Sequence, residues 1–438
     1  MGYAFAMSSS VQKSRVATRS LAVVGAGAVL LFGSRFLLNF FGPAVAYSMR
    51  KDLDYALDSE EFIRFLSVVT GGAVRQATLK RLKNGAEYYP AELAAIREAK
   101  TAINMEFYEF NPGEVADAML KALTERAAAG VSVQLIVDAI GSMNTQKSYF
   151  DPLLKAGGKM FFYHPVRWNT WQRANNRTHR KLIVIDGKVG FIGGSGVADH
   201  WIRPTKLGPT WRDTMFQIGG ETVAGLTTTF AENWLQVSGE ILCAPEHFDC
   251  VPEKGSPSFV VSSTPQDGGT QARVLIQALV NCARHSICIT TPYFLPDRSA
   301  RQALIDAAQS RGVKVKILTA GPHIDHPVVR TLSHHSSRRL VEAGAEIYEY
   351  EPSMIHAKLM TIDGQWSVLG SANFDHRSFA LNDEVNMAVL DRAMASELDQ
   401  DFEDDLKQSR RLTLQRLKQR TALGGALEAV APFIVRES

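Results

Sequence analysis

Two short segments of this sequence carry the same set of reactive side chains. Each has a histidine, a lysine two positions later and an aspartate five positions after the lysine, followed by a turn rich in glycine and serine. The two sets are His179, Lys181 and Asp186, and His356, Lys358 and Asp363. An imidazole can act as a nucleophile or transfer protons, and a lysine ammonium binds anions. Because the pattern occurs twice at matching places, chance does not explain it.

Strand geometry would bring these groups onto one surface. Side chains two positions apart on a β-strand point to the same face, so each histidine lies beside its lysine. Residues 182–185 and 359–362 are predicted to continue as buried strands that end in tight Asp-Gly turns. If the two segments meet, one pocket holds two imidazoles and two cations. Such a pocket suits a phosphate diester, because one histidine can attack phosphorus while the other protonates the leaving alkoxide.

An internal duplication supplies the elements that position these segments. Apolar, β-rich runs near residues 100 and 284 are each followed by a helical pattern, over 114–129 and 298–311, and then by a second apolar run. This order is typical of an α/β fold whose sheet is covered by helices. Two copies are too few for a solenoid, which needs about three. The sequence therefore predicts two similar domains packed face to face.

The paired motifs resemble the two HKD motifs of the phospholipase D superfamily, and specifically those of its bacterial cardiolipin synthases. Further segments similar to that family lie at 106–110, 211–214, 292–297, 375–379 and 382–384, so the resemblance covers roughly residues 60 to 420. It implies an α/β fold of two similar phospholipase D-like α/β/α sandwich domains. Each domain would have a mixed β-sheet, and the two would pack about a pseudo-two-fold axis.

The resemblance also implies an activity, which is metal-independent phosphatidyl transfer through a covalent phosphohistidine, with no cofactor. His179 would be the nucleophile and His356 the general acid and base. Asp213 and Glu384 match the carboxylates of the family that orient the histidines, each acting on the histidine of the other half. A carboxylate at Nδ1 fixes the tautomer and leaves Nε2 as the reactive atom.

Phosphate binding is implied, on the same resemblance, for a set of cationic and polar side chains. These are Lys181, Lys358, Ser195, Ser371 and Asn373. Asp186 and Asp363 belong to the catalytic motifs, but we expect them to tie the strand turns rather than to act on the substrate. One position departs from the family pattern, because Gly196 stands where the family usually has asparagine.

The leading hypothesis is therefore a phosphatidyltransferase that uses phosphatidylglycerol as donor, acceptor or both. The alternatives are a hydrolytic phospholipase D or another phosphodiesterase of the superfamily, such as a nuclease, and a catalytically silent membrane-binding relative. A nuclease needs a basic groove with aromatic stacking positions, whereas the net charge here is only +3. We expect a phospholipid substrate and an anionic membrane surface as partners, and no nucleic acid.

Composition excludes several other classes of protein. A chain of 438 residues favours two or three domains, and 45% hydrophobic with 21% charged residues excludes a disordered or fibrous chain. Four cysteines are too few for a disulfide scaffold, and their spacing from histidines does not indicate a zinc site. We therefore predict no metal.

The chain divides into five predicted parts. They are an apolar N-terminal segment (1–50), a first domain (51–236), a linker (237–267), a second domain (268–405) and a basic amphipathic C-terminal segment (406–438). The linker is rich in Pro, Ser and Gly. Its two cysteines, Cys243 and Cys250, pair in an oxidising compartment or remain free thiols.

Both ends of the chain suggest a membrane. The apolar residues 21–33 and 36–47 flank Arg35, and they are compatible with a single membrane anchor, a long signal peptide or a buried or interfacial helix. Six basic residues between 407 and 420, interleaved with leucines, suit either a helix on an anionic membrane or a solvated helix packed on the domain. The predicted location is the bacterial cell membrane, through the anchor or peripherally.

Overall fold

The computed structural model describes residues 47–49, 53, 55–165, 176–206, 208–264 and 271–417. Nearly all of the apolar N-terminal run and the residues after 417 lie outside this part of the chain. The anchor, signal-peptide and interfacial-helix interpretations therefore stay predictions. Within the described residues, no helix is both long enough and apolar enough to cross a bilayer.

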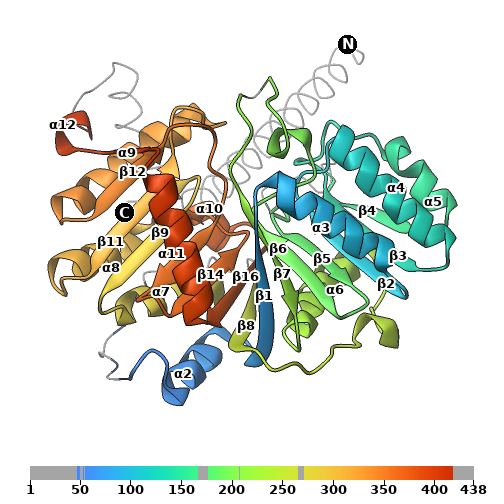
Figure 1. The fold of residues 1–438 in the computed structure, drawn as a ribbon, viewed down its shortest axis with the longest axis horizontal. Coiled ribbons are helices and arrows are strands. Elements are labelled where there is room, and N and C mark those ends of the chain that lie inside the picture. Colours follow the sequence, from blue (N-terminus) through green and yellow to red (C-terminus); the bar gives the residue numbers. More distant parts are fainter. Residues whose placement is uncertain are drawn as a thin grey trace, which may run out of the picture.

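One mixed sheet of 15 strands runs through the molecule (Figure 1). The strands of the first half are β1 (Arg75–Lys83), β2 (Ala102–Phe107), β3 (Ser132–Asp138), β4 (Lys159–Tyr163), β5 (Lys181–Ile185), β6 (Val189–Gly193) and β7 (Thr214–Gly219). Those of the second half are β8 (Ser256–Ser263), β9 (Ser286–Thr290), β11 (Lys314–Ala320), β12 (Glu346–Tyr350), β13 (Leu359–Ile362), β14 (Trp366–Gly370), β16 (Glu384–Leu390) and β17 (Ser409–Arg411). Strands β10 (Phe294–Leu295) and β15 (Phe374–Asp375) form a separate pair.

The strand order repeats between the two halves. Toward the centre it is β4-β3-β2-β5-β6-β7-β1 in the first half and β12-β11-β9-β13-β14-β16-β8 in the second, where β17 adds one further strand outside β12. In each half the three strands at the start of the order pair in parallel, and the rest pair antiparallel. The prediction of two similar halves with mixed sheets is confirmed. The two sheets are nevertheless continuous, because β1 and β8 pair antiparallel at the centre.

Helices cover both faces of each half-sheet. They are α3 (Gly85–Glu98), α4 (Glu114–Ala128), α5 (Asp151–Lys155) and α6 (Val223–Ser238), then α7 (Gln271–Cys282), α8 (Arg298–Gln309), α9 (Pro327–Glu342) and α11 (Arg392–Leu406). Strand β5 shows the layering. Ile183 and Ile185 pack in the core formed with α3, α4 and α5, whereas Leu182 and Val184 pack against α6. Consecutive side chains of a buried strand thus serve opposite layers.

Strand β8 lies inside the range that was expected to be a linker. Its composition predicts a connection over 237–267, but residues 256–263 form β8, which corresponds to β1 and completes the second half-sheet. Phe259 and Val261 are buried there, and this alternation supplies the apolar face of a strand. The cysteines of the connection are free thiols. The rest of the five-part division stays a prediction.

Helix α2 (Glu60–Thr70) packs on the second half although it precedes the first half in the chain. Phe62 and Leu66 are buried in the same core as α7 and α8, and Trp366 Nε1 donates to the Leu57 carbonyl at 2.7 Å. The helix has one apolar face, and such a face packs wherever apolar surface is available, irrespective of sequence proximity.

The basic C-terminal segment does not continue as a helix from residue 407. Strand β17 pairs antiparallel with β12 at the edge of the sheet, and the helical turn α12 (Leu414–Leu417) ends the described part of the chain. Arg410 and Arg411 form ion pairs with Glu351 (3.1 Å) and Glu346 (3.4 Å). The prediction of a basic amphipathic helix is therefore wrong for residues 409–411, because their backbone pairs with the edge strand β12 instead.

Candidate active site

Two short backbone contacts between the halves place the two histidines. The His179 N–H donates to the Asp383 carbonyl at 2.8 Å, and the His356 N–H donates to the Arg212 carbonyl at 2.7 Å. In each case the accepting residue directly precedes one of the predicted orienting carboxylates. The halves thus exchange equivalent contacts, and each motif meets an acidic side chain from the other half.

Each histidine has its Nδ1 against a carboxylate. His179 Nδ1 lies 3.0 Å from both carboxylate oxygens of Glu384, and His356 Nδ1 lies 3.0 Å from Asp213 Oδ2. All four side chains are buried. A carboxylate is an acceptor only, so Nδ1 of His179 carries the hydrogen and Nε2 keeps its lone pair. His356 Nδ1 lies 2.8 Å from Lys358 Nζ as well as 3.0 Å from Asp213, and the accepting carboxylate favours the hydrogen on Nδ1 there too. The structure therefore brings together both predicted pairs across the halves.

The two carboxylates are themselves held in place. Glu384 Oε2 accepts from Ser371 Oγ at 2.5 Å. Asp213 Oδ1 accepts from the Thr214 N–H at 2.8 Å, and Oδ2 accepts from Trp201 Nε1 at 3.1 Å. Hydrogen bonds to an ionised acceptor are stronger than bonds between neutral groups. Each histidine is consequently oriented by a carboxylate that has little freedom to rotate.

The two lysines lie beside the histidines and are buried. Lys181 Nζ donates to the His179 carbonyl at 2.7 Å, and Lys358 Nζ donates to the His356 carbonyl at 2.5 Å. Lys181 Nζ also lies 5.5 Å from the centre of the Tyr108 ring. An ammonium has three hydrogens, so each lysine keeps donors that can bind an anion.

Burial keeps both histidines neutral in the absence of substrate. It lowers the pKa of His356 to about 3, helped by the charge of Lys358, and it lowers the pKa of His179 well below the usual value. A neutral imidazole with a free Nε2 is the form that acts as a nucleophile. A phosphate anion bound nearby acts in the opposite direction, because negative charge raises the pKa of a histidine.

The pKa values of the lysines and carboxylates beside the histidines are shifted as well. Burial lowers the pKa of Lys358 to about 8, although Asp213 and Glu384 oppose the shift, and burial also lowers the pKa of Lys181. Burial raises the pKa of Glu384 to about 7. Burial opposes the ionisation of Asp213 too, but the hydrogen bond from His356 lowers its pKa.

Only some of the side chains predicted to bind phosphate lie where we expected them. Strands β6 and β14 end at Gly193 and Gly370, so Ser371 corresponds to Gly194 and not to Ser195. Ser195 Oγ is buried beside the Tyr88 hydroxyl. Asn373 follows β14 and is buried, and its Oδ1 has no hydrogen-bond partner among the described residues. The assignment of phosphate binding to these side chains stays a prediction.

Steric contacts explain why the first motif has glycines in its turn. A Cβ at Gly194 would lie 2.3 Å from Asp213 Oδ1, and a Cβ at Gly196 would lie 2.9 Å from both Cβ and the carbonyl oxygen of Glu109. Neither position has room for a side chain unless its neighbours move. The departure from the family pattern at Gly196 therefore reflects close packing against the segment that follows β2.

Asp186 and Asp363 follow β5 and β13 at the ends opposite the lysines. At about 3.3 Å per residue along a strand, each aspartate lies about 16 Å from its lysine. The Asp186 carboxylate accepts three successive backbone N–H groups at the start of β2, at 2.8 to 2.9 Å. Asp363 does the same before β9, at 2.7 to 2.8 Å. Each aspartate has a φ of 53°, which Asp tolerates in turns. This geometry supports the structural role predicted for them.

The Asp186→Asn variant is expected to lower the free energy of unfolding by about 1–3 kcal/mol, because the amide replaces one of the accepting oxygens with a donor. The rate per folded molecule should stay within about twofold of wild type, since surface and turn changes distant from the site act on stability. Urea unfolding followed by circular dichroism, with rates normalised to folded protein, measures both quantities. A large loss of rate with unchanged stability would contradict the structural role.

The same aspartate gives a pH dependence of stability. Backbone hydrogen bonds lower the pKa of Asp186 against the opposing effect of burial. Its contribution is therefore present above the unfolded-state pKa of about 3.9 and is lost as the pH falls below that value.

Aromatic rings lie beside both histidines, and the sequence pattern did not indicate them as part of the site. The Tyr108 ring centre lies 5.3 Å from that of His179, and the Trp201 and Trp211 centres lie 5.7 and 5.2 Å from that of His356. Tyr108 and Trp211 fall in segments noted only for their resemblance to the family, and no local pattern marks Trp201. These rings exclude water, in agreement with the lowered histidine pKa values.

The arrangement can carry out nucleophilic substitution at a phosphodiester. It offers two neutral imidazoles with oriented Nε2 atoms and two ammonium groups in a buried site. In the part of the chain that the structure describes, no group of three or more His, Cys, Asp or Glu side chains is placed to hold a metal ion.

Comparison with known families gives a match to the family model described as "Cardiolipin synthase, PLD-like domain", over residues 93–201 and 275–406. Each of these two ranges contains one histidine–lysine motif. The duplication seen in the sequence and in the sheet thus coincides with the two parts of the match.

Individual proteins give the same result. The chain is 34% identical over 352 residues to "Cardiolipin synthase 2" of Bacillus anthracis, covering 79% of this chain and 68% of that protein. It is 33% identical over 376 residues to "Cardiolipin synthase" of Listeria monocytogenes serotype 4b, covering 84% and 78%. The structure of phosphatidylserine synthase from Haemophilus influenzae Rd KW20 has a TM-score of 0.65 at 14% identity, covering 85% of this chain and 97% of that chain. This last likeness shows a shared fold.

Proposed function

The chain belongs to the cardiolipin synthase family with PLD-like domains, and we propose that it transfers a phosphatidyl group between phospholipids, with phosphatidylglycerol as donor, acceptor or both. The observation that carries the proposal is the pair of buried histidines, each with Nδ1 against a carboxylate of the opposite half. Two such histidines allow one to bond to phosphorus while the other moves the proton.

In the first step, Nε2 of neutral His179 attacks phosphorus and forms an N–P bond, and the bond from phosphorus to the glycerol oxygen of the leaving group breaks. That oxygen takes a proton from Nε2 of His356. His356 carries this proton because the nearby phosphate anion raises its pKa. Lys181 and Lys358 stabilise the charge on the non-bridging oxygens. Assignment of His179 as the nucleophile follows the family resemblance.

In the second step, a hydroxyl of another phospholipid replaces the released glycerol. His356 accepts its proton while the hydroxyl oxygen attacks phosphorus, and the N–P bond to His179 breaks. Both histidines return to their starting state. With phosphatidylglycerol as donor and acceptor, the products are one cardiolipin and one glycerol, so atoms and charges balance.

We expect kcat/KM to fall as the pH rises through about 8, because Lys358 then loses the charge that binds the phosphate. The Lys358→Arg variant is expected to be slower but to lose this alkaline limb, since a guanidinium stays charged. Initial rates of cardiolipin formation across neutral and alkaline pH measure the limb. An identical limb in wild type and variant would exclude Lys358 as its origin.

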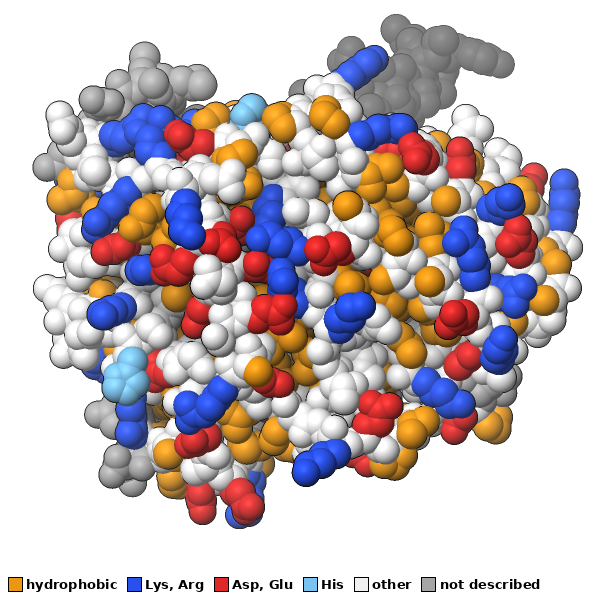
Figure 2. All heavy atoms as spheres, viewed as in Figure 1, with side chains coloured by type: hydrophobic (Ala, Val, Ile, Leu, Met, Phe, Trp, Pro, Cys, Tyr) orange, Lys and Arg blue, Asp and Glu red, His pale blue; other side chains and the backbone are white. Residues whose placement is uncertain are grey.

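The lipid substrate places the enzyme at a bacterial membrane surface. Two exposed apolar side chains support contact with lipid, Met143 after β3 and Val328 after β11, which are equivalent strands of the two halves. On the face drawn in Figure 2, basic and acidic side chains are interspersed among the described residues and form no continuous basic band. The net charge of only +3 does not favour the nuclease alternative.

Product analysis tests the proposed function. Purified full-length protein is incubated with phosphatidylglycerol vesicles, and the lipids and water-soluble products are identified by mass spectrometry. We expect cardiolipin and glycerol from wild type and neither from His356→Ala. Phosphatidic acid without cardiolipin would replace the transferase by a hydrolytic phospholipase D.

A further inference from the structure

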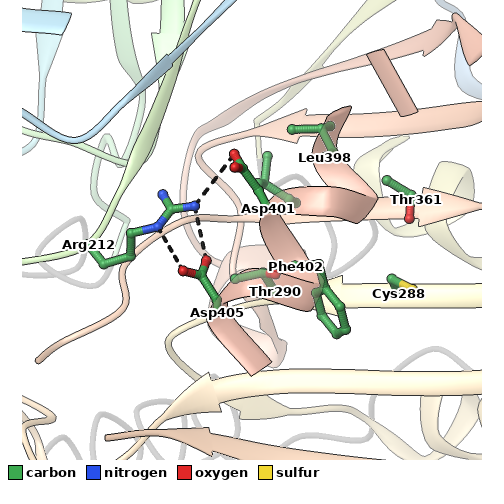
Figure 3. Close-up of a pocket in the computed structure, with 9 residues that line it drawn as sticks. Arg212, Cys288, Thr290, Thr361, Leu398, Asp401, Phe402 and Asp405 are labelled. Carbon is green, nitrogen blue, oxygen red and sulfur yellow. Dashed lines mark hydrogen bonds and ion pairs between the residues drawn. The ribbon is translucent and has the colours of Figure 1, made fainter. Parts of the chain in front are cut away.

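A buried arginine directly precedes the carboxylate that holds His356. The Arg212 side chain enters a small pocket between the sheet and α11 of the second half, where it points toward Asp401 and Asp405 (Figure 3). Its Nη2 lies 3.0 Å from Asp405 Oδ2 and 3.8 Å from Asp401 Oδ2, and its Nε lies 3.4 Å from Asp405 Oδ1. A side chain of the first half is thus held by a helix of the second half.

The same guanidinium is hydrogen-bonded to the chain on the C-terminal side of Asp213. Its Nη1 donates to the Asp213 carbonyl at 2.6 Å and to Thr214 Oγ1 at 2.7 Å. The carbonyl of Arg212 itself accepts the His356 N–H. The guanidinium, the peptide of Asp213 and the peptide of His356 therefore form one connected set of hydrogen bonds, and displacement of the arginine would move the carboxylate and the histidine with it.

The two aspartates of α11 near Arg212 have different cationic partners. Asp401 is paired with cations of β1, since Arg81 Nη1 lies at 2.5 Å and Lys83 Nζ at 2.9 Å. Asp405 is left as the nearer carboxylate of Arg212. A buried ion pair adds little net stability, because desolvation offsets the attraction, but it is costly to break and holds one geometry.

The other half of the molecule repeats this arrangement with the opposite charge. The residue directly before Glu384 is Asp383, whose carbonyl accepts the His179 N–H. Its carboxylate accepts from the Tyr163 hydroxyl at 2.5 Å and from Asn176 Nδ2 at 3.3 Å, and both partners belong to the first half. Each orienting carboxylate is therefore preceded by a side chain that is anchored in the half containing its histidine.

We propose that Arg212 and Asp405 act as positioning residues for His356. Their ion pair sets where Asp213 lies relative to His356 Nδ1, and so aims Nε2 of His356 at the oxygen that it protonates. Neither residue touches the substrate. The inference rests on the proposed function, because it assigns His356 to proton transfer.

The test compares two leaving groups in the Asp405→Asn variant, in which the amide keeps the shape of the carboxylate. Cardiolipin formation from phosphatidylglycerol needs a proton for its alkoxide leaving group. Release of p-nitrophenol from a phosphatidyl p-nitrophenyl ester, followed in a single turnover, needs none because the phenolate is weakly basic. We expect cardiolipin formation to slow about 10- to 100-fold and the p-nitrophenol burst rate to change less than about threefold.

Two matched variants accompany the test. Asp404→Asn changes the neighbouring residue of α11, whose exposed side chain pairs with Lys407, and should leave both rates unchanged. Tyr163→Phe removes the equivalent anchor of Asp383, and it should slow both reactions to the same extent because His179 forms the new bond in both.

Equal slowing of both reactions by Asp405→Asn, or no slowing of either, would overturn the proposal. The burst amplitude measures the fraction of folded protein, and the burst rate measures the reactivity of the active site in the folded molecules. A reduced amplitude with unchanged rates for both substrates would show a merely structural role, which also overturns it. Failure of the proposed function is a separate result, because wild type in the same preparation would then form no cardiolipin.

Discussion

The His179→Ala variant is expected to release no p-nitrophenol burst and to form cardiolipin about 10⁴-fold or more slowly than wild type. Its Nε2 is the atom that bonds to phosphorus in the proposed first step, and no other described imidazole lies in the same position against Glu384. Removing the nucleophile stops the reaction before either leaving group departs. Intact-protein mass spectrometry should accordingly detect no covalent phosphatidyl adduct.

The His356→Ala variant is expected to lose cardiolipin formation but to keep the p-nitrophenol burst, unlike His179→Ala. Cardiolipin formation should fall by a similar factor, because neither the departing alkoxide nor the incoming hydroxyl can exchange its proton. The p-nitrophenol burst should persist within about tenfold, because that leaving group needs no protonation. The phosphohistidine should then accumulate and appear as an adduct on the peptide that contains His179.

These two variants decide the roles of the histidines. A burst in His179→Ala that is absent from His356→Ala would reverse the assignment, and near wild-type cardiolipin formation in either variant would refute the shared site. His285→Ala serves as a control, since this exposed histidine lies in the segment before β9 and should have no effect on either rate.

The Glu384→Gln and Asp213→Asn variants are expected to lose about 10³- to 10⁴-fold in kcat while KM changes little. The amide can donate to Nδ1, and this favours the tautomer whose hydrogen is on Nε2. Glu384→Gln therefore removes the lone pair of His179 that attacks phosphorus, and Asp213→Asn disorients His356. Steady-state rates with phosphatidylglycerol, together with the burst assay, separate the two effects.

Only Glu384→Gln should abolish the p-nitrophenol burst, because only that variant affects the nucleophile. Glu240→Gln is a matched control, since Glu240 is exposed and forms a surface ion pair with Lys159. A surface pair contributes at most about 1 kcal/mol. An unchanged kcat in both active-site variants would show that the carboxylates do not orient the histidines.

Much of the site was predictable because its pattern is local. His179 and Lys181 lie two positions apart on an extended chain, so any strand places them on one face. The second copy at His356 and Lys358 shows that the pattern has a function, and the repeated strand–helix–strand order predicted two similar α/β halves. The Asp-Gly pair predicted the turn at Asp186, and the hydrogen bonds of Asp186 are consistent with the structural role expected for it.

The features that were not predictable depend on contacts distant in the sequence. The segment of β8 has the composition of a linker, yet it pairs with β1 because both half-sheets would otherwise expose an edge. Arg410 and Arg411 belong to a basic, leucine-containing pattern that suits a helix, yet their backbone pairs with the open edge of β12 and forms an edge strand.

By itself, the sequence predicted which groups would do the chemistry and determined on which kind of element they lie, because side-chain spacing along a strand depends only on local backbone geometry. The pairing of each carboxylate with a histidine of the opposite half was expected only from the family resemblance, and the structure shows its geometry. Tertiary structure alone decided that Trp201 joins the site and that Arg212 reaches α11. Those contacts depend on which surfaces are buried against each other, and the free energy of that burial is a property of the whole folded chain.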